Sequence, residues 1–438
     1  MNARECAYVS LKRYVSSQKY LNIEADSTIK RMRLQDAEKN LYTALFYGTV
    51  ERQITLDYDL RYLCSRPLEQ LDENVLLILR MSLYQLYYLD RIPPYAVLQE
   101  AGNLTRRFAA RNAVSFVNGV LRSAQRQQGK IPLPADEIQR LSVLYSTPEW
   151  LCRLWQNAYG ADTAEKILQA FDRPAPITLH CNTLKTTVAE QLQALERSGI
   201  AAYALPQLPR AVRLKGSVPV EKLTGLDAGM YFVQDAASQM CVEIFAPRRG
   251  ERILDACACP GGKSFAAALC MENEGEIHAC DLHENKLSLI RRGAQRLGIS
   301  VIRTEACDGT EHSAEMDKQY DRVLCDVPCS GLGVLAKKPE IRHRTEESIA
   351  RLPQIQYRIL ENCASYVRPG GILQYSTCTL NPAENEENVR RFLQAHPSFT
   401  AQPFAAAGRE WTDGMMTVFP HETDCDGFFV AKMKRTEP

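Results

Sequence analysis

The chain has 438 residues, of which 45% are hydrophobic and 24% charged, and its formal net charge is +1. This composition is that of an ordinary globular protein, and the length allows two or three domains. No apolar run reaches the roughly 20 residues that span a bilayer, and the start of the chain is too polar for a signal peptide, so we expect a cytoplasmic protein without a membrane partner.

Residues 1 to about 130 predict an all-helical region. Apolar residues recur at helical spacing over 41–50 and 75–86. Pro93 and Pro94 interrupt this pattern before a further helix, and residues 131–136 have the composition of a linker. Residues 101–134 contain six basic residues and no acidic one, which favours a phosphate-rich partner. We therefore expect a helical domain over residues 1–135.

Residues 140–240 mix helical and strand patterns. The stretch 150–171 predicts one helix that begins near Pro148. Residues 177–181 predict a strand and residues 188–199 another helix. Short strands are expected near Tyr203 and Val212. The region is interpreted as a small α+β module.

From residue 241 to 438, strand and helix patterns alternate. This alternation is typical of an α/β domain with a doubly wound, mostly parallel sheet of the Rossmann-like kind. The expected strands are 252–256, 276–281, 301–305, 322–326 and 372–376. Two last apolar runs, 415–419 and 427–433, predict an antiparallel hairpin at the end of that sheet.

A glycine-containing loop follows the first of these strands. Gly261 and Gly262 let the backbone approach a ligand, and the start of the next helix offers amides to electron-rich groups. Asp281 ends the next strand, the usual position of a carboxylate that binds ribose hydroxyls. Asp308 and Asp326 follow two further strands. The loop is neither a Walker loop nor GxGxxG, which disfavours a dinucleotide.

Two cysteines, Cys329 and Cys378, follow strand-length apolar runs. Because loops at the carboxyl ends of such strands hold the chemistry of α/β enzymes, the two thiols suggest covalent catalysis through sulfur. Most of the other cysteines lie in apolar runs and are interpreted as small buried residues. No CxxC pair and no zinc-finger spacing occurs, so we expect no metal.

Several motifs in combination resemble a known family. Residues 255–263, 326–331 and 376–385, with 232–239 and 426–429, are similar to the S-adenosylmethionine-dependent RNA 5-methylcytosine methyltransferases of the Nop2/Sun group. Residues 79–86 and 116–122 resemble the NusB-like RNA-binding helical domain, and the pairing of both parts is similar to bacterial enzymes that act on small-subunit rRNA. Cys259 departs from the family pattern, which usually has alanine there.

The resemblance implies roles for individual residues. Cys378 matches the nucleophile that adds to carbon 6 of cytosine, Cys329 the cysteine that helps release the product, and Asp326 the residue that binds the base and borders the cofactor. Asp281 would bind the ribose and Asp308 the adenine side of S-adenosylmethionine. The methionine moiety would lie against Cys257, Ala258, Cys259, Pro260, Gly261, Gly262 and Lys263.

RNA is the implied partner, with the target base flipped out of its stack. Candidate phosphate contacts are Arg106, Arg107, Arg111, Arg122, Lys337, Lys338, Arg342 and Arg344. Two alternatives stay open: the same chemistry on tRNA or another rRNA cytosine, and a non-catalytic RNA-binding ribosome assembly factor. A thiol redox protein is disfavoured by the absence of CxxC. Nothing in the sequence indicates an interface between copies, so we expect a monomer.

Overall fold

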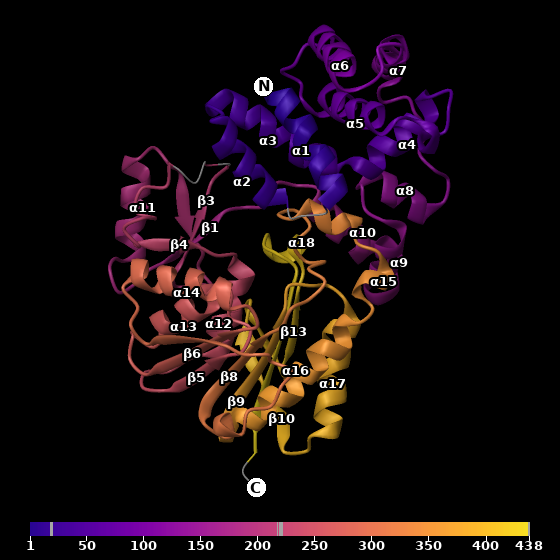
Figure 1. Cartoon of the computed structure of the whole chain (residues 1–438). Coiled ribbons are helices and arrows are strands. Elements are labelled where there is room, and N and C mark those ends of the chain that lie inside the picture. The colour runs from indigo at the N-terminus through magenta and orange to yellow at the C-terminus, as the bar shows by residue number, and fades with distance from the viewer. Residues whose placement is uncertain (18–20, 217, 219–221, 437–438) are drawn as a thin grey trace. The chain divides into compact units, whose positions relative to one another are not determined.

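The computed structural model describes residues 1–17, 21–216, 218 and 222–436, which form two compact units (Figure 1). The first unit contains Met1–Asp172 together with Lys337–Arg344. The second contains Arg173–Ala336 and Thr345–Pro438. Within the described ranges, no helix is long and apolar enough to cross a membrane.

The first unit is helical, as the apolar periodicity predicted. Asp72 caps α5 by accepting hydrogen bonds from the backbone of Asn74 and Val75, and Pro94 occupies the first turn of α6. The α-helices are α1 Ala3–Ser17, α2 Leu21–Met32, α3 Asp36–Glu51, α4 Gln53–Leu63, α5 Glu73–Tyr88, α6 Pro94–Phe108, α7 Ala113–Gln127, α8 Glu137–Leu144, α9 Glu149–Tyr159 and α10 Ala161–Phe171. Two 3₁₀ helices, η1 Leu68–Gln70 and η4 Pro339–His343, complete the unit.

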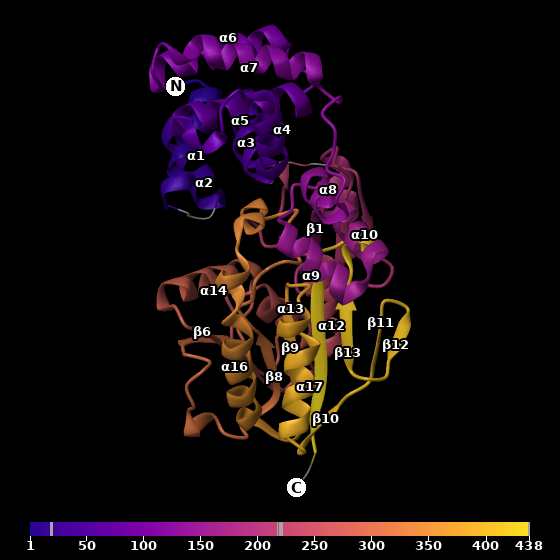
Figure 2. The ribbon, with the colours of Figure 1, turned by 90° about the vertical axis from the view of Figure 1, so that its right-hand side faces the viewer.

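The core of this unit lies between α1, α3, α5 and α7. Tyr42, Phe46, Ile78 and Leu121 are all completely buried there. Helices α6 and α7 pack side by side (Figure 2). One prediction was wrong: residues 150–171 form two helices rather than one, because Gly160 adopts a φ of +83° between α9 and α10.

The second unit begins with a small antiparallel sheet of order β2-β3-β1-β4. Its strands are β1 Thr178–Cys181, β2 Ala202–Ala204, β3 Ala211–Leu214 and β4 Tyr231–Val233. Helix α11 (Val188–Arg197) starts at a reciprocal capping box between Thr187 and Glu190. Helices α8 to α10 belong to the first unit, whereas the sequence pattern grouped residues 140–171 with this sheet.

The large sheet has the order β10-β14-β9-β8-β5-β6-β7, with β13 also pairing with β14. Strands β9, β8, β5, β6 and β7 are parallel, and β14 is antiparallel to β9. The strands are β5 Arg252–Asp255, β6 Glu276–Asp281, β7 Ile302–Ala306, β8 Tyr320–Asp326, β9 Val367–Thr377, β10 Phe399–Ala401, β13 Met415–Val418 and β14 Phe428–Arg435. A separate hairpin consists of β11 Phe404–Ala406 and β12 Arg409–Trp411.

Alternate residues of these strands enter two different cores. Ile253 and Leu324 pack with α12 (Ala236–Phe245), α13 (Gly262–Cys270) and α14 (Glu284–Leu297). Leu254 and Val323 pack with α16 (Leu352–Tyr366) and α17 (Glu386–Ala395) on the other face. This two-sided burial explains the near-continuous apolar runs of the central strands. The short elements are η3 Ala314–Met316, α15 Glu346–Ile349, η5 Pro382–Glu384 and α18 Pro420–Thr423.

The predicted doubly wound sheet is confirmed. All five expected strands form, but β9 begins at Val367 rather than at residue 372; β13 and β14 form the expected antiparallel hairpin. From β5 the chain moves outward through β6 and β7, then returns to place β8 on the other side of β5. The order of strands therefore reverses between β5 and β8, and ligands of open α/β sheets bind beside the carboxyl ends of strands at such a point.

Candidate active site

The two candidate catalytic cysteines meet at this carboxyl edge. The Sγ atoms of Cys329 and Cys378 are 3.3 Å apart, and both residues are half-buried. Cys329 follows β8 and Cys378 follows β9, the neighbouring parallel strand. The hydrogen bond with Cys378, followed by burial, raises the pKa of Cys329 well above its usual value. Either thiol can donate in this hydrogen bond, and the raised pKa favours the protonated form of Cys329.

A charged pair lies at the end of β8. The Lys263 amine is 2.6 Å from an Asp326 carboxylate oxygen, and Ser376 donates to the other oxygen at 2.8 Å. Burial opposes the charge on Lys263, but Asp326 outweighs it and the pKa of the amine is raised. Cys378 also contributes to this increase, so Lys263 and Cys378 act on each other electrostatically. A nearby cation favours a thiolate.

A buried carboxylate connects the loops of the two cysteines. Glu384 is completely buried and accepts hydrogen bonds from the backbone and hydroxyl of Ser330 at 2.9 and 2.5 Å. Gln356 and Asn381 donate to the same carboxylate at 2.8 and 2.9 Å. Because Ser330 directly follows Cys329, this network fixes that thiol beside the loop of Cys378. The sequence marked Glu384 only as part of a motif and assigned it no role.

Two glycines bring further loops against this site. Gly333 donates to the Cys378 carbonyl at 3.0 Å, and Gly427 donates to the Gly333 carbonyl at 2.8 Å. A Cβ atom on Gly333 would overlap the backbone of Gly427. Phe428, the next residue, places its ring 5.1 Å from the Lys263 amine. The close approach of the two backbones at Gly333 and Gly427 therefore requires glycine at position 333.

The expected cofactor loop joins β5 to α13. Gly261 has a φ of +108°, which a residue with a side chain adopts only with strain. Asp281 ends β6 and accepts hydrogen bonds from the backbone of Cys259 at 3.2 Å and His283 at 3.1 Å. Asp308 follows β7 and is held by Thr310. A fixed carboxylate beside a glycine turn and a helix start fits a ligand with a ribose.

Two side chains of the loop region face inward instead. Asp255 is buried, and Ser264 donates to it at 2.6 Å. Burial raises the pKa of Asp255 to about 7, although the Ser264 hydrogen bond acts in the opposite direction. Cys257 packs against the apolar core beneath α16, and burial raises its pKa well above the usual value. Its thiol is therefore poorly suited to act as a nucleophile.

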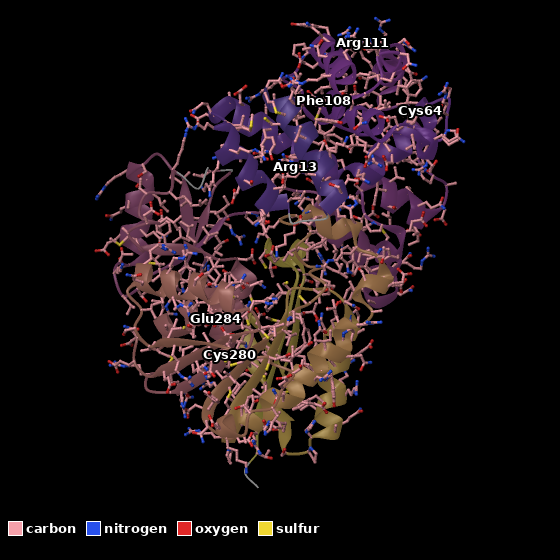
Figure 3. All side chains as sticks on the ribbon, in the orientation of Figure 1. Arg13, Cys64, Phe108, Arg111, Cys280 and Glu284 are labelled. Carbon is pink, nitrogen blue, oxygen red and sulfur yellow. The ribbon has the colours of Figure 1, made fainter. Side chains whose placement is uncertain are left out.

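The predicted phosphate contacts all belong to the first unit. Arg106 and Arg107 are exposed on α6, and Arg122 is exposed on α7. Arg111, which is labelled in Figure 3, lies exposed between these helices. Arg107 forms an ion pair with Glu5. The segment Lys337–Arg344 also belongs to this unit. Lys337 and Lys338 are exposed and Arg344 is half-buried.

Arg342 does not fit the prediction of a phosphate contact. Its side chain is 3% exposed, and its guanidinium donates to the carbonyl of Tyr145 at 2.9 Å and to the hydroxyl of Thr147 at 2.7 Å. It also donates to the carbonyl of Phe171 at 3.3 Å. The residue thus binds η4 to the helices around it, because a buried guanidinium needs several acceptors.

Comparisons with known proteins cover almost the whole chain. Family models match residues 1–126 (NusB family), 147–221 (Methyltr_RsmF/B-like, ferredoxin-like domain) and 242–434 (16S rRNA methyltransferase RsmB/F). The probable ribosomal RNA small subunit methyltransferase B of Bacillus subtilis is 36% identical, over 99% of both chains. The Serratia proteamaculans ribosomal RNA small subunit methyltransferase B is 33% identical, over 99% of this chain and 98% of that protein. The crystal structure of PH0851 matches with a TM-score of 0.83 and 25% identity, over 98% and 97% of the two chains.

Proposed function

Because this chain belongs to the ribosomal RNA small subunit methyltransferase B family, we propose that it transfers a methyl group from S-adenosylmethionine to carbon 5 of one cytosine in small-subunit (16S) rRNA. The resemblance of both parts of the chain, NusB-like and methyltransferase, is confirmed by the matches to the family models. The choice of carbon 5 and of a covalent route rests on the residues of the site.

The 3.3 Å approach of Cys329 and Cys378 carries the proposal. Carbon 5 of cytosine is a weak nucleophile, and addition of a thiolate to carbon 6 makes it electron-rich. This covalent route divides a difficult step into easier ones. The site supports it because the Cys329 thiol lies within hydrogen-bonding distance of Cys378 and Lys263 places a positive charge near Cys378.

The residues of the chain have distinct roles in this sequence. Cys378 forms a bond to carbon 6, while Asp326 hydrogen-bonds the base. S-adenosylmethionine, when bound, would supply the methyl group to the electron-rich carbon 5, and S-adenosylhomocysteine would be the leaving group. Loss of the carbon 5 proton to solvent then restores the double bond between carbons 5 and 6 and expels the Cys378 thiolate. The Cys329 thiol stabilises that leaving sulfur, which explains why a second cysteine lies within hydrogen-bonding distance.

The cofactor would lie along the carboxyl edge from β8 to β7. The loop from Cys257 to Lys263 would hold its methionine moiety, Asp281 its ribose and Asp308 its adenine side. The start of α13 and the fixed carboxylate of Asp281 support this orientation.

RNA phosphates would contact the exposed arginines of α6 and α7 and the lysines of the Lys337–Arg344 segment. We omit Arg342 from this set because its guanidinium is buried. Each phosphate contact that is lost should weaken RNA binding. It should also reduce the slope of log affinity against log salt concentration by about one. Lys338→Ala, measured by RNA binding at several salt concentrations, tests one such contact. An unchanged slope would remove Lys338 from the set.

The chemistry is tested by methyl transfer from labelled S-adenosylmethionine to protein-free 16S rRNA and to assembled small subunits. Wild type and Cys329→Ala are compared with Cys378→Ala, and Cys270→Ala serves as a control for cysteine replacement. We expect label on one cytosine with wild type and control, no transfer with Cys378→Ala, and an RNA–protein adduct that survives denaturation with Cys329→Ala.

Other outcomes would change the proposal in specific ways. Transfer by Cys378→Ala at the wild-type rate would exclude the covalent role of that residue. Label on tRNA but on no form of 16S rRNA would change the substrate and leave the chemistry intact. Absence of cofactor binding and of transfer would favour a non-catalytic assembly factor.

A further inference from the structure

A group of side chains that could bind a metal ion lies on β6 and after β7, apart from Cys329 and Cys378. His278 and Cys280 are two residues apart on β6 and therefore lie on the same face of the strand. Cys307 directly follows β7, and its Sγ is 3.1 Å from that of Cys280. The Cys280 Sγ is also 3.4 Å from His278 Nε2 (Cys280 is labelled in Figure 3). All three ligand atoms lie within 4.8 Å of one another.

A carboxylate joins this group. Glu305 pairs with Cys280 in the register of β6 and β7, and its Oε2 is 2.9 Å from His278 Nε2. Two sulfurs, one imidazole nitrogen and one carboxylate oxygen are a donor set that suits tetrahedral zinc. We propose that His278, Cys280, Cys307 and Glu305 bind a zinc ion that joins β6 to β7.

The surroundings can accommodate the change in protonation. Binding of Zn²⁺ by two thiolates releases their two protons, and the Glu305 carboxylate then gives the site one net negative charge beside the Arg303 guanidinium. With Nε2 on the metal, His278 Nδ1 carries the proton, and the Tyr320 hydroxyl 2.7 Å away accepts it. Arg303 donates to Nδ1 at 2.7 Å, so binding of the metal through Nε2 would require its guanidinium to give up this hydrogen bond and keep Glu276 at 2.6 Å and Glu305 at 3.2 Å as acceptors.

A disulfide is the other product expected of two close thiols. It would use Cys280 and Cys307 but would not engage His278, which is 1% exposed and directs Nε2 toward both Cys280 and Glu305. The convergence of four donor atoms of three chemical kinds therefore favours the metal.

The position of the site suggests what the ion does. Strand β7 is an edge of the sheet and has no fully buried residue, so packing holds it weakly. Cys280 directly precedes Asp281, and Cys307 directly precedes Asp308. A zinc ion would thus fix the edge strand that carries Asp308.

The test measures metal in the full-length protein, purified with zinc present and without chelator. We expect close to one zinc per chain for wild type and for Cys270→Ser, and less than a tenth of that for Cys280→Ser and Cys307→Ser. Cobalt added to the metal-free wild type should give the thiolate charge-transfer and d–d absorption of a tetrahedral site. Hydrogen exchange of the β7 amides should slow when zinc is restored.

Circular dichroism and thermal unfolding show whether the serine variants are folded. If Cys307→Ser did not fold, Glu305→Gln provides the alternative variant, with weaker zinc binding expected. Wild type without zinc and without a cobalt spectrum would overturn the proposal. Equal zinc content in wild type, Cys280→Ser and Cys307→Ser would overturn it as well, as would a Cys280–Cys307 disulfide that forms in preference to metal binding. None of these readouts depends on methyl transfer.

Discussion

Two pairs of cysteines lie at the carboxyl ends of adjacent parallel strands, with similar separations and different surroundings. The sulfurs of Cys329 and Cys378 are 3.3 Å apart, and those of Cys280 and Cys307 are 3.1 Å apart. The first pair lies beside a lysine and a buried carboxylate network. The second lies beside an imidazole and an exposed carboxylate. We therefore expect the neighbouring groups, rather than the separation of the two thiols, to decide the chemistry of each pair.

The positions of the pairs in the sheet differ as well. The first pair follows β8 and β9, which are central strands with helices on both faces. In the second pair, Cys280 lies on β6 and Cys307 follows the edge strand β7. A reacting thiol needs rigid neighbours that keep it aligned with its substrate, whereas a metal can supply rigidity where packing is weak.

Replacing one cysteine of each pair should have its most different effect on the rate of methyl transfer. Under the proposed mechanism, Cys378→Ala removes the sulfur that would bond to carbon 6, and we expect methyl transfer to fall on the order of 10³-fold or more. Cys307→Ala leaves the reacting atoms in place, so we expect a loss of less than about tenfold, equivalent to about 1.4 kcal/mol. Single-turnover transfer rates measure both. Equal losses for the two variants would contradict the division of roles.

Stability should distinguish the carboxylates that accompany the pairs. Glu384→Gln replaces one acceptor oxygen of a fully buried carboxylate with a donor that faces other donors, and we expect a cost of about 2–4 kcal/mol. Glu305 is largely exposed, so Glu305→Gln in metal-free protein should cost less than about 1 kcal/mol. Urea unfolding measures both free energies. A larger cost for Glu305→Gln would show that the edge is the more tightly constrained region.

The pH dependence of stability should reveal the protonation of Asp255, the last residue of β5, which lies between β8 and β6 in the sheet. Its pKa is raised to about 7, mainly by burial, against about 3.9 in an unfolded chain. Between these values the folded state holds a proton that the unfolded state has lost, so the free energy of unfolding falls as pH rises from about 4 to 7. Three pKa units correspond to at most about 4 kcal/mol.

Asp255→Asn should remove this contribution. Urea unfolding at pH 5 and pH 8 is the measurement, with wild type losing more stability than Asp255→Asn between the two values. The variant keeps an oxygen that can accept from Ser264. An identical pH dependence in both proteins would mean that Asp255 is ionised throughout.

The smallest effect on stability is expected for Cys307, whose half-buried thiol follows the edge strand β7. In metal-free protein, Cys307→Ser keeps a group that can hydrogen-bond Cys280 and should change the free energy of unfolding by less than about 1 kcal/mol. Added zinc should then stabilise wild type but not this variant. Thermal unfolding with and without zinc measures the difference, and zinc stabilisation of both proteins would place the ion elsewhere.

Much of the second unit could be predicted from the sequence. Strands β5, β6 and β8 are buried on both faces, so their apolar runs are unambiguous, and polar residues mark their ends. The same local signals indicated Cys329, Cys378 and Asp326. Their mutual approach depends only on adjacent parallel strands ending at the same edge, which the alternation of strands and helices already implied.

Other features depend on contacts between distant residues. The role of Glu384 requires Ser330 and Gln356, which come from different parts of the chain. Arg342 was misinterpreted because a cluster of basic residues is normally exposed, and only the fold supplies the carbonyl acceptors that permit its burial. The ligands on β6 and after β7 have no motif spacing, because strand pairing rather than sequence brings them together.

The segment Lys337–Arg344 has a practical consequence for dividing the protein. It follows the Cys329 loop in the chain, yet it belongs to the helical unit, where Arg342 and Ile341 are buried. A fragment that starts at Arg173 would contain this segment without the residues that cover it, exposing an apolar side chain and a guanidinium that has lost its acceptors. The two units therefore cannot be separated by one cut, and shuffling the helical unit between relatives would require exchanging this eight-residue insert with it.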